Sequence, residues 1–177
     1  AVSAARLFDI PTESIRKVLA EFTGLEGRIQ LIKEIKGVKY INDTTATIPE
    51  ATIAAMNSIA SQYDLKPGAL ILIAGGADKN LEFGELAKII AKQIKILLLL
   101  KGAATEKLET QIKKEASDQK IQLKILKFDD MKKAVATAAK LAKSGDIVLL
   151  SPGCASFGLF RHEFERGEKF NQAVNEL

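Results

Sequence analysis

The sequence predicts a doubly wound α/β fold with a mostly parallel, Rossmann-like sheet and an early antiparallel hairpin at the sheet edge. Strand-like and helix-like periodicity alternate along most of the chain, which is typical of this class. Apolar runs such as ILLLL at 96–100 and IVLL at 147–150 suit strands that helices bury on both faces. A chain of 177 residues with 47% hydrophobic side chains can form one full core, so we expect one principal domain.

The first 24 residues are expected to lie outside that domain. A helical pattern of apolar residues follows Pro11-Thr12 and ends at Thr23-Gly24, where glycine can stop a helix. We interpret residues 1–24 as the helical tail of a preceding central domain and residues 25–177 as the principal domain. Because the sequence begins at Ala1 rather than at methionine, we expect it to be a piece of a longer protein.

The elements of the principal domain follow in order. The stretch RIQLIKEIKGVKYIND predicts two short strands joined at Lys36-Gly37. The next helix is expected to begin at Thr47, because Thr47-Ile48-Pro49-Glu50 has the spacing of a capping box with a proline in the first turn. After it, each predicted strand leads into an amphipathic helix, and the last of these helices carries Phe160, Phe164, Phe170 and Val174. These strands are expected at 69–74, 95–100, 121–126 and 147–150.

Charge and composition point away from several classes of partner. The chain has 26 basic and 22 acidic residues, a net charge of +4, but lysine and glutamate are interleaved along the helical segments as on solvated faces. No basic block or cluster of stacking aromatics indicates a nucleic-acid partner. Apolar runs such as 96–100 are too short to span a bilayer, and the single cysteine suits a reducing compartment. We therefore predict a cytoplasmic protein without membrane insertion.

Three polar loops follow predicted strands: NDTTAT at 42–47, GGADKN at 75–80 and SPGCAS at 151–156. In open parallel sheets, ligands bind outside the carboxyl ends of the strands, so these loops are expected to meet at one rim. Glycines allow close backbone approach, and free N–H groups favour an anion, to which Lys79 would add a full positive charge. The alternative is that Gly75-Gly76 only turns the chain and that Lys79 is solvated.

Other catalytic interpretations are weaker. There is no G-x-x-x-x-G-K-[ST] phosphate loop. Ser156 lies in G-x-x-S-x-G, one residue away from the spacing of a nucleophile elbow. Cys154 with His162 could form a thiol pair, but a lone cysteine beside a strand end is more often a small buried hydrophobe. With one histidine and one cysteine in total, we predict no zinc site, and none of these patterns is strong enough to assign a catalytic residue within this segment.

Three motifs in this order resemble the C-terminal domain of the Mur ligases. They are YINDTTATIPEA at 40–51, IAGGADKNLEF at 73–83 and LLSPGCASFGLFRHEFERGEKF at 149–170. The last motif is the most specific, and the resemblance extends over the whole chain. Family members that add other amino acids carry a D-Y-x-H-x-P type sequence where this chain has Asp43-Thr44-Thr45. The chain is therefore most similar to the D-glutamate-adding branch.

The resemblance implies a reaction in peptidoglycan precursor synthesis. ATP phosphorylates the carboxylate of UDP-N-acetylmuramoyl-L-alanine, and the amine of D-glutamate attacks the acyl phosphate to form an amide. In such ligases the first domain holds the UDP moiety, and the central domain holds the ATP phosphates, magnesium and most of the catalytic groups. The C-terminal domain closes over them with D-glutamate, so this segment alone is expected to be inactive.

The resemblance also implies roles for particular residues. The positions that match the D-glutamate pocket are Thr47, Lys79, Ser156 and, beside it, Phe157; those that match nucleotide contacts are Arg28 and Asp43. A dicarboxylate needs a cation and several donors, which a lysine flanked by backbone N–H groups provides. Thr47 has a competing and compatible role as the cap of the following helix.

The sequence departs from the family pattern at two places near these residues. Thr45 stands where the family usually has lysine, and Gly27 stands where it usually has the histidine of a His-Arg pair. The lost lysine removes a positive charge, so either another residue replaces it or the nucleotide contact has shifted. Two alternatives remain open: a related ligase domain of the folylpolyglutamate-synthase type, and a non-catalytic module that binds a small anion.

Overall fold

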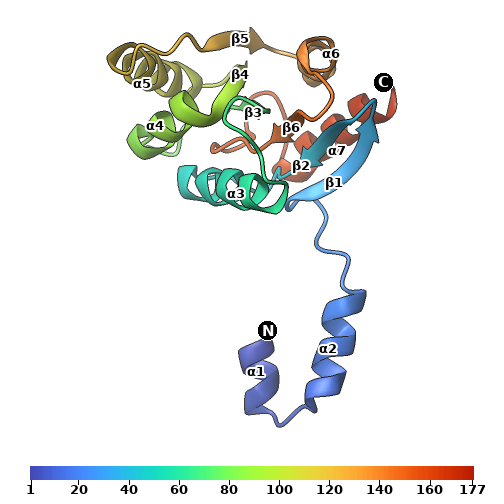
Figure 1. Cartoon of the computed structure of the whole chain (residues 1–177). Helices are drawn as coiled ribbons and strands as arrows, with labels where there is room; N and C mark the ends of the chain where they lie inside the picture. The colour runs from blue at the N-terminus through green and yellow to red at the C-terminus, as the bar shows by residue number, and fades with distance from the viewer.

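The computed structural model describes all of residues 1–177, and its N-terminal helices stand apart from a sheet domain (Figure 1). Helices α1 (Val2–Leu7) and α2 (Thr12–Glu21) contain no buried residue. The linker at 22–29 leads from them into the sheet. The periodicity had predicted α2 but not α1, whose six residues are too few to show an apolar stripe.

The sheet domain confirms the predicted doubly wound fold. Its six strands lie in the order β1-β2-β6-β3-β4-β5, and only the β1–β2 pair is antiparallel. The hairpin turn is the predicted Lys36-Gly37, whose φ angles of 51° and 77° are those of a type I′ turn. The strands are β1 (Gln30–Ile35), β2 (Val38–Asn42), β3 (Leu70–Ala74), β4 (Ile94–Leu100), β5 (Lys124–Phe128) and β6 (Ile147–Leu150).

Helices cover both faces of this sheet and divide its core in two. One face carries α3 (Pro49–Gln62), α4 (Gly84–Gln93) and α5 (Thr105–Asp118), and the other carries α6 (Met131–Leu141) and α7 (Glu163–Asn175). Alternate residues of one strand enter the two cores: Leu72 packs with the first set of helices, and Ile71 and Ile73 pack with the second. None of the helices has the length and apolar character needed to cross a membrane.

Two predicted elements differ from the structure in their boundaries. β5 begins at Lys124 rather than at residue 121, because the chain is still leaving α5 there: Lys120 has a φ of 56°, and the N–H of Ile121 donates to the Ala116 carbonyl. The last helix begins at Glu163, so Phe160 precedes it. The Phe160 N–H bonds the Ser156 carbonyl in a turn, and the His162 imidazole caps the helix by accepting from the Glu165 N–H.

The predicted capping box at Thr47 is wrong. The helix begins at Pro49, Ile48 occupies the N-cap position, and no side chain caps the helix. Proline at the first position has no N–H to satisfy, which lowers the need for a cap. The Thr47 side chain is therefore not committed to the helix, and its backbone N–H bonds the Thr45 carbonyl.

The hairpin brings the incoming chain to a particular rim of the sheet. Because β1 runs antiparallel to β2, Gln30 pairs with Asn42, so β1 begins where β2 ends. The linker from α2 therefore reaches the sheet at the carboxyl ends of the parallel strands. This is the rim at which the polar loops lie.

Candidate functional site

The three polar loops meet at one rim, as predicted. β6 lies between β2 and β3, so its loop is the central one. On one side the Asp43 N–H donates to the Leu150 carbonyl at 2.7 Å, and on the other the Ala77 N–H donates to the Ala155 carbonyl at 2.9 Å. Backbone bonds thus hold the loops that carry Asp43, Lys79 and Ser156 in one surface.

The glycines of this rim allow neighbouring segments of the backbone to pack closely together. Gly76 has a φ of 148°, and a Cβ built on it would lie 2.2 Å from the Ala155 carbonyl oxygen. A Cβ on Gly75 would lie 2.7 Å from the Leu100 carbonyl oxygen. The sequence suggested that these glycines let the backbone approach a ligand. Their space is instead occupied by neighbouring loops, which they allow to pack at backbone distance.

Lys79 is exposed and makes no hydrogen bond or ion pair. Asp78 before it accepts from the Asn80 N–H at 2.8 Å, which closes a small turn around the lysine. On the neighbouring loop Ser156 is 3% exposed, whereas Phe157 is 61% exposed. The Ala77–Ala155 bridge holds these two loops side by side, and the Lys79 ammonium has no hydrogen-bond or ion-pair partner in the chain.

Asp43 is buried and accepts hydrogen bonds from two neighbouring segments of the rim. Its carboxylate is 4% exposed and accepts from the Ser151 hydroxyl at 2.8 Å and from the Ile29 N–H at 3.2 Å. Burial raises the pKa of the Asp43 carboxyl, against the opposing effects of these two hydrogen bonds and of Arg28. The sequence had not indicated Ser151 as part of this site, although it opens the SPGCAS loop.

The turn that carries Arg28 is fastened to the loop after β2. The Gly27 carbonyl accepts from both the Thr45 N–H at 3.1 Å and the Thr45 hydroxyl at 3.0 Å. Ile29 in the same turn has a φ of 46°, which is strained for a β-branched residue. The two positions that depart from the family pattern are thus hydrogen-bonded partners, and no cation stands at position 45. The Arg28 side chain is exposed above them.

A buried arginine that the sequence reasoning missed joins two of the loops. Arg166 on α7 is 0% exposed. Its guanidinium donates to the Thr44 carbonyl at 2.7 Å, the Thr44 hydroxyl at 3.1 Å and the Cys154 carbonyl at 3.1 Å. Burial lowers its pKa to about 10, so it stays protonated at neutral pH. The available signal was its position four residues before Phe170, on the apolar stripe of α7.

The alternative nucleophiles do not form catalytic pairs. Cys154 is fully buried, and burial raises the pKa of its thiol to about 12. The His162 imidazole caps α7 and is hydrogen-bonded to neither Cys154 nor Ser156. No group of three or more histidine, cysteine, aspartate or glutamate residues is placed to hold a metal ion.

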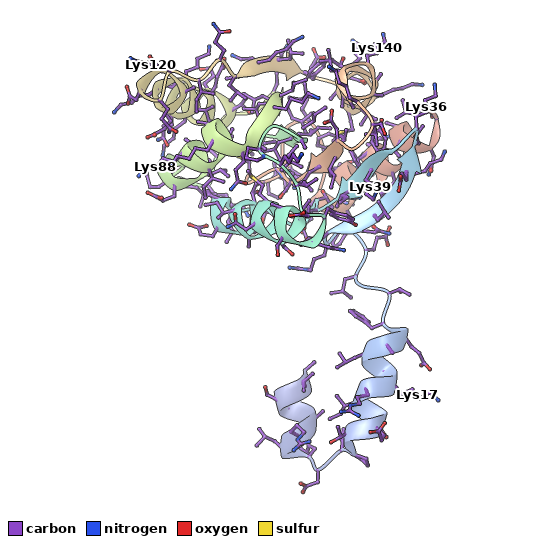
Figure 2. The ribbon with its side chains drawn as sticks, in the orientation of Figure 1. Lys17, Lys36, Lys39, Lys88, Lys120 and Lys140 are labelled. Atoms are coloured by element: carbon purple, nitrogen blue, oxygen red, sulfur yellow. The ribbon has the colours of Figure 1, made fainter.

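The basic side chains are dispersed over the molecule (Figure 2). The labelled lysines lie on α2, at the hairpin turn, on β2, on α4, after α5 and on α6. Several of the basic residues are paired: Lys39 bonds Glu34, and Lys88 bonds Glu85. Such pairs on a solvated surface contribute little to stability.

Comparison with known protein families identifies this arrangement. A family model described as the Mur ligase glutamate ligase domain matches residues 27–154. The chain belongs to the Mur ligase family. It is 45% identical over 174 residues to a UDP-N-acetylmuramoylalanine–D-glutamate ligase of Roseiflexus sp. strain RS-1, an alignment that covers 98% of this chain and 35% of that protein. This chain thus spans about a third of the length of such Mur ligases.

Solved structures share the fold. The MurF ligase of Thermotoga maritima, in complex with ADP, aligns with a TM-score of 0.60 and 22% identity over 99% of this chain and 37% of its own. E. coli FolC, in complex with DHPP and ADP, aligns with a TM-score of 0.60 and 18% identity over 94% of this chain and 34% of its own. At these identities the likeness concerns the Mur ligase fold alone.

Proposed function

We propose that this chain is the C-terminal domain of an ATP-dependent ligase that joins D-glutamate to UDP-N-acetylmuramoyl-L-alanine. The observation that carries the proposal is the 45% identity to a ligase of that name over nearly the whole chain. In the reaction, ATP transfers its γ-phosphoryl group to the alanyl carboxylate and ADP leaves. The amine of D-glutamate then attacks the acyl carbon, loses a proton and expels phosphate.

We propose that this domain delivers D-glutamate from the rim of loops. Lys79 binds one carboxylate, because its ammonium is exposed and has no partner in the protein. Thr47 and Ser156 supply hydrogen bonds to the carboxylates, and Phe157 forms the apolar side of the pocket. Such positioning needs no nucleophile in this domain, since its contribution is to place the amine near the acyl phosphate.

Arg28 and Asp43 are proposed to serve the nucleotide in different ways. The exposed Arg28 guanidinium is available to a phosphate or ribose oxygen. Each Asp43 oxygen accepts one hydrogen bond from the protein and keeps a free lone pair, but the residue is only 4% exposed, so its burial limits direct contact with the nucleotide. In the structure as it stands, Asp43 supports the turn that carries Arg28. We assign the ATP phosphates and magnesium mainly to the central domain.

We propose that residues 1–24 belong to that preceding domain and that 25–177 form the C-terminal domain. Exposed apolar side chains lie on the two helices, as Leu7 and Val18 do, and directly after them, as Phe8 and Phe22 do. Their apolar surface has no cover within this chain, and the first domains of the full-length ligase would provide it. The family match likewise begins only at residue 27.

Amino-acid selectivity of the full-length protein tests the proposal. With ATP and UDP-N-acetylmuramoyl-L-alanine present, D-glutamate should support ADP release and amide formation, while L-glutamate and D-aspartate should not. Turnover with L-glutamate alone would contradict the assignment and favour a ligase of the folylpolyglutamate type. Binding without any ATP-dependent turnover would favour a small-anion module.

A substitution tests the role of Lys79. Lys79→Ala in the full-length enzyme should raise the KM for D-glutamate by about 10- to 100-fold, because a charge-assisted bond to the substrate is lost, and should change the KM for ATP little. Lys140→Ala, which removes an exposed lysine from α6, is the matched control. Equal effects of Lys79→Ala on both KM values, or none, would remove Lys79 from the pocket.

A further inference from the structure

The loop that carries Lys79 makes few hydrogen bonds to the rest of the protein, although the partly buried Leu81 side chain packs against the core. Its first anchor is the Ala77–Ala155 bridge, and its far end is Phe83, which is fully buried beside α4. Between these points, residues 78–82 make no backbone–backbone hydrogen bond. The Asp78–Asn80 bond is internal to the loop. Backbone hydrogen bonds therefore do not fix the position of Lys79.

One side chain from another element donates hydrogen bonds to this loop. Lys107, in the first turn of α5, donates from its Nζ to the Leu81 carbonyl at 2.7 Å and to the Glu82 carboxylate at 3.1 Å. The same ammonium lies 5.9 Å from the centre of the Phe83 ring. These are the only hydrogen bonds that join residues 78–82 to another element.

The bond to Leu81 is the important one of these contacts. Glu82 is 84% exposed in its side chain, so its ion pair with Lys107 is screened by solvent and weak. The bond to the Leu81 carbonyl is partly buried and has a charged donor, which strengthens it. Because a carbonyl belongs to the backbone, this bond fixes the path of the chain two residues after Lys79.

We propose that Lys107 is a positioning residue for the substrate loop: it holds residues 78–82, and with them Lys79, in place next to the Ser156 loop. This inference rests on the proposed function of Lys79 in binding a carboxylate of D-glutamate. A lysine held in place before the substrate binds loses less conformational entropy on binding, which lowers the KM for that substrate. Lys107 itself does not touch the substrate.

The test uses the full-length enzyme with a set of matched variants. Lys107→Met keeps most of the apolar stem and removes the charged donor. Lys107→Gln, which is shorter and uncharged, is a second variant, and Lys107→Arg restores a charged donor. Lys114→Met, an exposed and unpaired lysine on the same helix, controls for the loss of one charge. Glu82→Gln removes the surface ion pair and leaves the bond to Leu81.

The first measurement is the rate of limited trypsin cleavage after Lys79, followed by mass spectrometry, because cleavage requires the loop to leave its folded path. Lys107→Met and Lys107→Gln should increase this rate about threefold or more without changing the thermal midpoint, because only the loop is released. Lys107→Arg, Lys114→Met and Glu82→Gln should be cleaved after Lys79 as the wild type is. An unchanged cleavage rate in both Lys107→Met and Lys107→Gln would show that Lys107 does not hold the loop.

The second measurement is the KM for each substrate. Lys107→Met should raise the KM for D-glutamate about three- to tenfold with little change in kcat or in the KM for ATP, and Lys107→Arg should recover most of the loss. A more mobile loop with an unchanged KM for D-glutamate would overturn the positioning role. If Lys79→Ala also has no effect on that KM, the proposed function of Lys79 has failed, while the cleavage rate after Lys79 still decides whether Lys107 holds the loop.

Discussion

Arg166 shows how a single buried charge can organise this rim without a carboxylate partner. Its three hydrogen bonds go to Thr44 and Cys154, which belong to the loops after β2 and β6. A planar guanidinium fits this arrangement, because its donors point in fixed directions toward several acceptors. Two of these acceptors are backbone carbonyls, so the arginine fixes loop paths rather than side-chain positions.

Replacing Arg166 should destabilise the protein markedly. Arg166→Met should lower the free energy of unfolding by about 3 kcal/mol, because it leaves buried acceptors unsatisfied, and Arg166→Lys should recover only part of this. Urea denaturation measures the effect. Arg161→Met, which removes an exposed arginine paired with Glu165, should cost less than about 0.5 kcal/mol. Equal losses of stability for Arg166→Met and Arg161→Met would contradict the role of Arg166 in fixing the two loops.

The raised pKa of Asp43 predicts a particular pH dependence. The folded state binds this proton more tightly than the unfolded state, so the contribution of Asp43 to stability is fully present below the unfolded pKa, near 3.8. That contribution is lost as the pH rises through the higher folded pKa.

Comparison with Asp43→Asn isolates this ionisation. The difference in the free energy of unfolding, wild type minus Asp43→Asn, should fall as the pH rises from about 3.8, and level off above the folded pKa. Denaturant melts at a series of pH values give this difference. A difference that rises over the same range would mean that the hydrogen bonds from Ser151 and Ile29 outweigh burial.

For single residues, the sequence could single out exposed candidates but not the buried residues that hold the loops. Lys79 could be picked out because it follows a strand and two glycines. Ser151, Arg166 and Lys107 could not, because their partners are backbone carbonyls or a carboxylate distant in the sequence, and no local pattern marks such contacts. Thr47 was assigned a cap from its spacing alone, and the extended Ile48 took that position instead.

Among the elements, α7 is the one most closely fitted to the site. A Cβ added to Gly167 would lie 2.7 Å from Thr44 Cγ2 and 3.0 Å from Asn42 Nδ2. Neither the Thr44 methyl group nor the Asn42 amide can move away easily. Thr44 is held by Arg166 and by the Glu163 carbonyl, and the Asn42 amide donates to the Gly167 carbonyl and to Asn171. Glycine in mid-helix is therefore a requirement of packing.

Gly167→Ala should be destabilising although alanine is the better helix former. The gain in helix propensity is at most about 1 kcal/mol, whereas forcing a methyl group into a packed contact costs about 1 to 3 kcal/mol. We expect a net loss of about 1 kcal/mol or more in chemical denaturation. Gly84→Ala in α4 is the control, because its Cβ would meet nothing within 4 Å, and it should be neutral or slightly stabilising. A stabilised Gly167→Ala variant would show that α7 can shift away.

Element prediction succeeded where local chemistry fixes the backbone. Lys36-Gly37 was recognisable as a turn because the glycine accepts a positive φ. The buried runs that became β3, β4 and β6 were recognisable because they are apolar throughout. β5 was displaced by about three residues because it is an edge strand with charged residues, and its start is set by pairing with β4 rather than by its own sequence.

For the molecule as a whole, residues 1–24 should contribute little to the stability of the sheet domain. Figure 1 shows α1 and α2 away from the sheet, and neither helix has a buried residue. A chain of residues 25–177 should therefore unfold within about 2 °C of the complete 177-residue chain in a thermal melt. A decrease of more than about 5 °C would mean that the two helices pack on the sheet domain and that the proposed boundary is misplaced.

The position of the site followed from topology rather than from any single motif. Once alternating strands and helices predicted a parallel sheet, the loops after the strands had to share a rim. Which strands are neighbours was not available from the sequence, because strand order depends on long-range packing of the two helix layers. The placement of β6 between β2 and β3, which brings the Asp43 and Lys79 loops to the same central loop, emerged only from the structure.

Because β1 runs antiparallel to β2, the linker joins the sheet at one end of this rim. If the domain rotates about the linker, the distance that each strand end moves depends on how far it lies from β1. The pivot lies at the start of β1, beside the end of β2, and strands are spaced about 4.8 Å apart, so the end of β3 is about 14 Å away and that of β5 about 24 Å. A rotation of about 20° would carry the end of β3, which leads to Lys79, through an arc of about 5 Å and the far edge through about 8 Å. The loops after β2, β6 and β3 would thus move less than the outer edge of the sheet at β5.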